Sequence, residues 1–112
     1  MHEMSLAESV VCIAEDAAQR EGASRVRAVL LDIGQLSHVA PEALAFCFDA
    51  VAAGTIVAGA RLEIRRLAGS GICRSCGASQ AMSEIYAVCD SCGSTALEPT
   101  AGTEMRVRAI DL

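Results

Sequence analysis

Two Cys-x-x-Cys pairs, each followed by glycine, lie in the second half of the chain and supply Cys73, Cys76, Cys89 and Cys92. Two residues between paired cysteines let one tight turn direct both sulfurs at one point, and a following glycine permits a positive φ. Four thiolates satisfy the tetrahedral preference of Zn²⁺ and leave no open position. The spacing therefore predicts a closed, structural zinc site.

Two other interpretations of these cysteines are a pair of disulfides and a pair of redox dithiols. Disulfides need an oxidising compartment, and a redox Cys-x-x-Cys usually occurs singly beside a βαβ pattern. The start of the chain, Met-His-Glu, lacks the basic and then apolar segments of an export signal. We therefore expect reduced thiols in a cytoplasmic protein, and the spacing favours zinc over both alternatives.

A second candidate site lies at the first three residues, Met1, His2 and Glu3. The imidazole of His2 follows an α-amino group whose usual pKa is about 8, so a metal can displace the amine's proton near neutrality. Nitrogen donors in this arrangement suit tetragonal or square-planar Ni(II) or Cu(II), and Glu3 can add an oxygen. The alternative is that His2 is a frayed terminal residue that binds nothing.

The remaining polar residues indicate no enzyme. His38 stands alone, and Cys12 and Cys47 lie on or beside apolar helix stripes, where we expect them to be core or near-core residues. The sequence contains no glycine-rich phosphate loop and no nucleophile elbow. The expectation is a metal-binding protein without catalytic residues.

The composition argues against several other classes of protein. The 112 residues carry a net charge of −5, whereas a nucleic-acid-binding domain is usually basic. Arg74 is the single cation between Cys73 and Cys92, so the cysteine segment also lacks a phosphate-binding surface. The sequence contains no run of about 18 apolar residues, which a membrane span would require. We expect no nucleic-acid partner and no membrane partner.

Two helices are expected to position the first candidate domain. Ser5 and Glu8 form a capping box that predicts a first helix over 5–21. Pro41 fits the first turn of a second helix, which Gly54 closes. The predicted apolar stripes are Leu6, Val10, Ile13 and Ala17 on the first helix, and Leu44, Cys47, Phe48 and Val51 on the second.

Three strands are expected at 24–34, 60–67 and 104–111, because apolar residues alternate or run continuously there. The last strand is not stable alone, so it should return to the sheet made by the first two. The fold class is then α+β, a small three-stranded sheet with two helices and an inserted zinc-ribbon-like domain.

The inserted segment sets the predicted domain boundaries. Residues 1–69 with 100–112 form one domain, and residues 70–99 form the zinc-binding domain. The glycine-containing segments that flank the zinc-binding domain, 69–71 and 99–102, are predicted to be hinges. Within it, Met82 to Val88 is expected to form a short strand.

These features together resemble the HypA/HybF family of nickel-incorporation proteins in NiFe-hydrogenase maturation. The resemblance covers essentially the whole chain. Its most specific parts are the start Met-His-Glu-Met-Ser-Leu, the turn Ile33-Gly-Gln-Leu36, the following Pro41-Glu-Ala-Leu-Ala-Phe46 and the paired cysteines. A four-cysteine site alone occurs in many unrelated proteins, but the same site behind a Met-His-Glu start is far more selective.

The resemblance implies a non-enzymatic nickel metallochaperone with two metal sites. His2, with the Met1 amine and Glu3, would bind Ni(II) as transferable cargo, and the four cysteines would hold a structural Zn(II). The implied partners are a HypB-type GTPase and the hydrogenase large-subunit precursor, and in some bacteria urease maturation proteins. The implied fold is similar to the one expected here, an α/β nickel-binding domain with an inserted zinc domain.

One departure from the family concerns histidine. Some relatives carry histidines near the zinc cysteines, whereas this chain has none between Cys73 and Cys92. Any coupling between the two metal sites would then depend on thiolate geometry or on hinge motion at 69–71. The alternative function is a zinc-ribbon protein–protein adaptor without a transferable metal.

Overall fold

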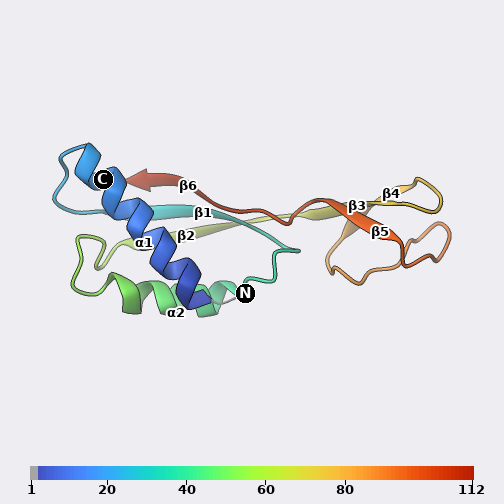
Figure 1. The fold of residues 1–112 in the computed structure, drawn as a ribbon, viewed down its shortest axis with the longest axis horizontal. Helices are drawn as coiled ribbons and strands as arrows, with labels where there is room; N and C mark the ends of the chain where they lie inside the picture. The colour runs from blue at the N-terminus through green and yellow to red at the C-terminus, as the bar shows by residue number, and fades with distance from the viewer. Residues whose placement is uncertain (1–2) are drawn as a thin grey trace. The chain divides into compact units, whose positions relative to one another are not determined.

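The computed structural model describes residues 3–112, which form two helices and six strands (Figure 1). In chain order these elements are α1 (Glu3–Arg20), β1 (Ala28–Gly34), α2 (Pro41–Ala52), β2 (Arg61–Leu67), β3 (Gly69–Cys73), β4 (Ser79–Met82), β5 (Leu97–Ala101) and β6 (Met105–Asp111). They make two three-stranded sheets, ordered β2-β1-β6 and β4-β3-β5. The predicted α+β fold is confirmed.

Two compact units make up the chain. The helix–sheet unit comprises the chain up to Leu31, Val39–Arg65 and Val107–Leu112. The cysteine unit comprises Asp32–His38 and Arg66–Arg106. This second unit is larger than the predicted zinc domain, because it also takes in the connection between β1 and α2. The domain boundaries at 69/70 and 99/100 stay a prediction.

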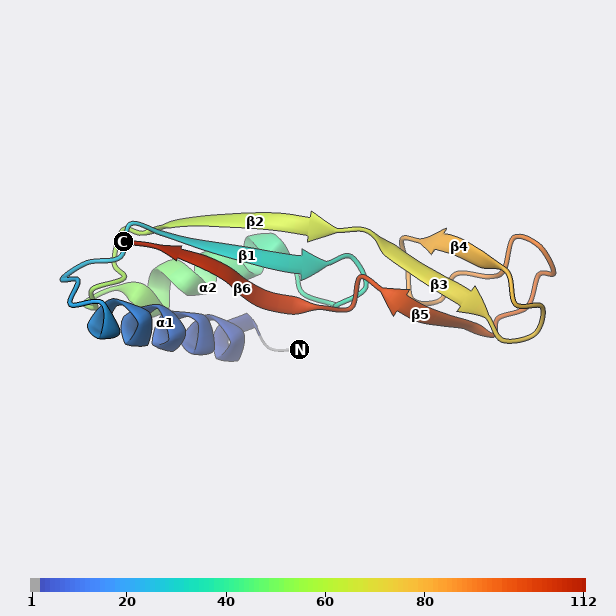
Figure 2. The same cartoon turned by 90° about the horizontal axis from the view of Figure 1, so that it is seen from above.

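β1 is the middle strand of the first sheet, and all its residues are buried except the half-buried Leu30. β1 and β2 run parallel and β6 runs antiparallel to them (Figure 2). The strand after the cysteines therefore does return to the sheet of the first two, as predicted. The continuous apolar run of β1 fits this central, covered position.

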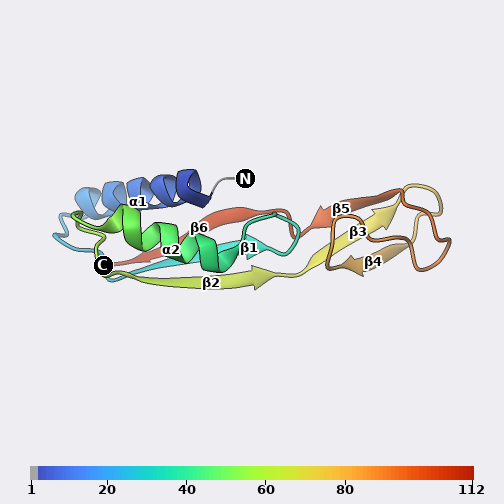
Figure 3. The same ribbon diagram turned by 90° about the horizontal axis from the view of Figure 1, so that it is seen from below.

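α1 packs against α2 in the helix–sheet unit (Figure 3). The predicted apolar stripe of α1 is confirmed at Val10 but otherwise lies one position away from the buried face, which consists of Ala7, Val10, Val11, Ala14 and Ala18. Ile13 is 49% exposed, and Cys12 is exposed rather than in the core. The small alanine side chains let the helix backbone lie close to its neighbours, so the larger side chains beside them remain outside.

The capping-box prediction is also wrong, because α1 begins at Glu3 and Ser5 lies inside its first turn. The second helix agrees with its prediction. It begins at Pro41, carries Glu42 in its first turn and buries Leu44 and Phe48. Proline has no amide hydrogen to leave unpaired at this position, and the carboxylate favours the positive helix end.

The flanks of the cysteine segment are strands, and the predicted hinges are wrong. β3 pairs antiparallel with β5, with Ser70 opposite Ala101 and Gly71 opposite Pro99. A Cβ atom at Gly69 would collide with the carbonyl oxygen of Met82. Glycine is therefore used here for close backbone approach, which sequence alone cannot distinguish from flexibility.

The strand predicted at Met82–Val88 is also wrong. The strand β4 ends at Met82, where residues 83–88 turn away and the amide of Ala87 donates to the carbonyl of Glu84 at 3.2 Å. Met82 itself is buried against the second sheet's core. The polar Ser83 and Glu84 end the strand, and the apolar residues after them lie in the loop.

Candidate metal centre

The four predicted ligands, Cys73, Cys76, Cys89 and Cys92, come together in the cysteine unit with all four sulfurs within 4.8 Å of one another. The Sγ atoms of Cys73 and Cys92 are 3.7 Å apart, and those of Cys76 and Cys89 are also 3.7 Å apart. Four sulfurs about 2.3 Å from a central ion in a tetrahedron are about 3.8 Å apart. The donor set and its spacing therefore fit one tetrahedral metal ion, and all four thiols are free of disulfides.

Both Cys-x-x-Cys turns have the same backbone geometry. The amide of Gly77 donates to the carbonyl of Cys73 at 2.8 Å, and the amide of Gly93 donates to the carbonyl of Cys89 at 2.8 Å. The two glycines have φ values of 79° and 73°, which favour glycine over any residue with a Cβ atom. The repeated geometry explains why glycine follows each cysteine pair.

Polar side chains tie the two turns together. The hydroxyl oxygens of Ser75 and Ser94 lie 3.1 Å apart. Gln80 on β4 donates its side-chain amide to the carbonyl of Val88 at 3.0 Å and accepts from the amide of Asp90 at 2.8 Å. Gln80 thereby fixes the chain before and inside the second turn. Sequence reasoning missed Gln80, because an isolated glutamine carries no signal of this contact.

An apolar cluster of Leu36, Met82 and Leu97 surrounds the two buried cysteines, Cys73 and Cys89. Cys76 and Cys92 are exposed. Leu36 comes from the connection between β1 and α2, far from the cysteines in sequence, and it too was missed. Each turn thus presents one buried and one exposed sulfur to the centre.

The first cysteine of each turn favours the thiolate. The backbone amides of Cys76 and Ser75, acting against burial, lower the pKa of Cys73 from 9.0 to about 6. The amides of Cys92 and Ser91 likewise lower the pKa of Cys89. Amide hydrogens directed at sulfur stabilise its negative charge, so these two thiols are prepared for metal binding before the metal arrives.

The second cysteine of each turn favours the protonated thiol. The amide of Ser94 lowers the pKa of Cys92, but the neighbouring Cys73 sulfur and the partial desolvation of the Cys92 sulfur outweigh it, so the pKa is about 12. The pKa of Cys76 is also raised: the amide of Ala78 lowers it, but the sulfur of Cys89 and the partial desolvation of the Cys76 sulfur outweigh that effect. Four thiolates cannot coexist at this distance without a cation between them.

The second predicted site is described only at Glu3, since Met1 and His2 lie outside the described residues. Glu3 is the first residue of α1, and its Oε2 atom accepts a hydrogen bond from the amide of Ala40 at 3.2 Å. Ala40 is the N-cap residue of α2 and has no side chain that could cap the helix. The Glu3 carboxylate therefore lies where the two helices of this unit begin.

His38 is exposed and adopts a positive φ of 62°, which is uncommon outside glycine. Within residues 3–112, the four cysteines are the single group of three or more His, Cys, Asp or Glu side chains close enough to hold one ion. His38 joins no such group, in agreement with its interpretation as an isolated histidine. The same part of the chain contains no helix both long and apolar enough to cross a membrane.

Asp32 on β1 is a fully buried carboxylate that sequence reasoning did not single out. Its Oδ2 atom accepts from both Nε and Nη2 of Arg106 on β6, each at 3.1 Å. The sequence could have indicated this pair, because Asp32 is a lone acidic residue within an apolar strand and a buried charge requires a partner. The pair belongs to the cysteine unit, and Asp32 is not a member of the four-cysteine group.

Comparisons with known proteins agree with this architecture. The family described as "Hydrogenase/urease nickel incorporation, metallochaperone, hypA" matches residues 1–112. Curated relatives named hydrogenase maturation factor HypA include one from Dechloromonas aromatica, 54% identical over all of this chain and 99% of its own length. Another, from Rhizobium leguminosarum bv. viciae, is 47% identical over the same shares.

Solved structures give the same result. The solution structure of the Ni metallochaperone HypA from Helicobacter pylori matches with a TM-score of 0.68 and 25% identity, covering 100% of this chain and 97% of that one. The full-length family match and the relatives at about half identity settle the family. The chain belongs to the HypA family of hydrogenase and urease nickel-incorporation metallochaperones.

Proposed function

We propose that this chain binds Ni(II) at its N-terminus and delivers it during NiFe-hydrogenase maturation, with a separate structural zinc at Cys73, Cys76, Cys89 and Cys92. The observation that carries the proposal is the closed set of four sulfurs, 3.7 Å apart in two pairs, within a chain matched along its length by a nickel-incorporation family. A closed thiolate site retains its metal, so a transferable ion needs a second, more open site.

Zinc suits the cysteine cluster better than nickel does. Tetrahedral S₄ sites are typical of zinc or of iron–sulfur proteins, whereas Ni(II) prefers square-planar or tetragonal nitrogen and oxygen donors. Each turn holds one sulfur among apolar side chains, which excludes water from that side of the ion. The zinc would stabilise the cysteine unit and take no part in nickel transfer.

The nickel ligands would be the Met1 amine, the His2 imidazole and Glu3. Glu3 supports this assignment because its carboxylate is anchored by the Ala40 amide at the start of α2. An anchored carboxylate beside a terminal chain gives an arriving cation a fixed charge to approach. A site made largely of terminal residues can exchange its metal, as delivery requires.

The partners would be those of the family: a HypB-type GTPase, the hydrogenase large-subunit precursor and, for a urease client, urease maturation proteins. Delivery would then take place in the cytoplasm. The curated relatives named hydrogenase maturation factors support a hydrogenase client.

Nickel titration of three proteins tests the proposal. Protein with an authentic Met1 terminus should bind one Ni(II) per chain while its zinc is retained. His2→Ala should abolish this binding, and a short extension before Met1 should do the same by blocking the amine. His38→Ala is the matched control and should bind as the unaltered protein does.

Equal nickel binding by the authentic, extended and His2→Ala proteins would refute the terminal site. If no form binds nickel while all retain zinc, the chain acts as a zinc-stapled protein–protein adaptor. Both results can be read by calorimetry together with metal analysis of the recovered protein.

A further inference from the structure

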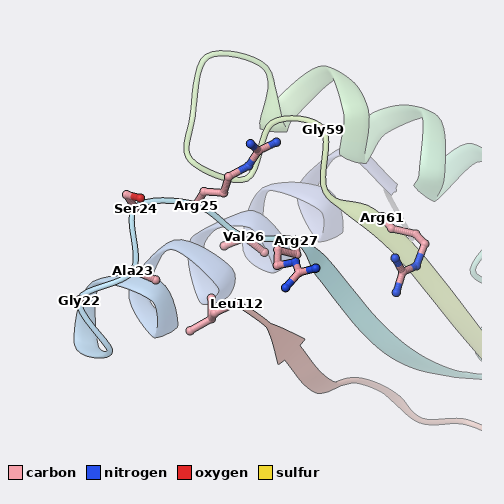
Figure 4. A pocket seen from close by; sticks show the side chains of 9 residues that line it. All are labelled: Gly22, Ala23, Ser24, Arg25, Val26, Arg27, Gly59, Arg61 and Leu112. Carbon is pink, nitrogen blue, oxygen red and sulfur yellow. The ribbon is translucent and has the colours of Figure 1, made fainter.

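A cavity of about 620 Å³ lies in the helix–sheet unit, where α1 has ended and the strands β1 and β2 begin (Figure 4). Its walls include three arginines, a serine and two apolar side chains: Arg25, Arg27, Arg61, Ser24, Val26 and Leu112. Ligand sites in proteins commonly have volumes of about 300–1,000 Å³. No residue of either metal site lines this cavity, so metal binding leaves it unexplained.

The charge of the cavity is opposite to that of the protein. Three of the nine cationic residues line it, although the chain carries a net charge of −5. Arg25 and Arg27 form no ion pair with the residues that the structure describes. Arg61 contacts Glu63 through its Nε atom at 2.6 Å.

Backbone pairing fixes the two arginines at the strand ends. The amide of Arg61 donates to the carbonyl of Arg27 at 2.9 Å, and the amide of Arg27 donates to the carbonyl of Asp111 at 2.8 Å. Both side chains line the cavity, while Arg25 extends in another direction, toward the loop before β2 (Figure 4). The backbone of each arginine is thereby fixed at the wall of the cavity, where its guanidinium group can meet an anion.

Carboxylate is the anion that these walls fit best. Guanidinium groups match the planar geometry of carboxylates in two-point hydrogen bonds. The lining has no aromatic side chain on which a nucleotide base could stack and no glycine-rich phosphate loop. The exposed Leu112 side chain offers apolar contact to the aliphatic part of a glutamate or to a neighbouring side chain.

We propose that this cavity binds an acidic peptide segment of a partner protein through its aspartate or glutamate carboxylates. Gly22 and Gly59 leave part of the wall without side chains, which gives an extended peptide backbone room to approach. The remainder of an acidic protein repels such a peptide, so the cavity would set where and how the partner docks. This proposal is independent of the nickel site.

Binding of fluorescein-labelled hexaglutamate, followed by fluorescence anisotropy at low salt, tests the proposal. Replacing Arg27 or Arg61 by glutamine should weaken binding about tenfold, the loss typical of one charge-assisted hydrogen bond. Arg74→Gln is the matched control, because Arg74 is equally an exposed arginine but lies in the cysteine unit and outside the cavity. It should bind the peptide as tightly as the unaltered protein does.

Three results would overturn the proposal. One is equal weakening by Arg27→Gln and Arg74→Gln, which would indicate diffuse electrostatics. Another is binding no tighter than that of neutral hexaglutamine. A third is stronger binding of inorganic pyrophosphate than of the peptide, which would assign the cavity to phosphates. Arg27→Gln should bind nickel normally, so failure here and failure of the nickel site are separable.

Discussion

Leu36 lies in the same buried cluster as Cys73, although the two residues are far apart in sequence. Leu36 is anchored there by its own amide, which donates to the carbonyl of Gly102 at 2.7 Å. Its neighbour Gln35 accepts from the amide of Gly69 at 3.1 Å. The connection between β1 and α2 is therefore part of the cysteine unit's core.

Leu36→Ala should destabilise the cysteine unit by about 2–4 kcal/mol, because a buried leucine is replaced by a cavity. Chemical denaturation of the zinc-loaded protein measures this change. Leu36→Met preserves the volume and should cost less than about 1.5 kcal/mol. Equal stability of the alanine variant and the unaltered protein would show that Leu36 contributes little to this core.

Cys73→Ser should release zinc and disorder the cysteine unit, because structural zinc contributes directly to folding. The helices belong to the other unit, so the far-ultraviolet circular dichroism signal of α1 and α2 should persist. Cys12→Ser, at an exposed cysteine of α1, should retain one zinc per chain. Loss of zinc from the Cys12 variant would contradict the assignment of the four ligands.

Zinc binding at pH 7 should release at most about three protons per ion, and most of them from Cys76 and Cys92. Four ordinary thiols would release about four, since metal displaces each thiol proton. Cys73, with a pKa of about 6, is already largely ionised at that pH. Calorimetry in buffers of different ionisation enthalpy counts the protons. A count of four would show that the turns form only after zinc binds.

Glu104 should stabilise the protein at neutral pH and lose that effect in acid. Its own amide and that of Gly102, the latter at 2.7 Å, lower its pKa below the ordinary value of 4.5. A pKa lower in the folded than in the unfolded state gives stability that is complete above the unfolded value and disappears as pH falls through the folded one. The unaltered protein should therefore lose stability below about pH 4.5 more steeply than Glu104→Gln. Parallel stability curves for the two proteins would refute this.

The sequence predicted correctly those features that depend on residues close to one another in the chain. Pro41 and Glu42 define the start of α2, the apolar run defines β1, and the spacing of the cysteines brings four sulfurs together. Three-dimensional contacts determined the rest. The sequence suggests that Gly69 is flexible. The structure instead requires glycine there, because the carbonyl oxygen of Met82 lies too close for a Cβ atom. The buried face of α1 follows its alanines because α2 packs closely, and no residue of α1 indicates that neighbour.

The order of strands in the first sheet has a consequence for the growing chain on the ribosome. β1 pairs with β6, but β6 follows all four cysteines in sequence and emerges after them. Until then one edge of β1 stays open, and an apolar open edge is a template for pairing with other chains. Closure of the metal-binding segment would shorten the search of β6 for that edge once β6 has emerged. Zinc supply during translation should therefore govern how much newly made protein aggregates.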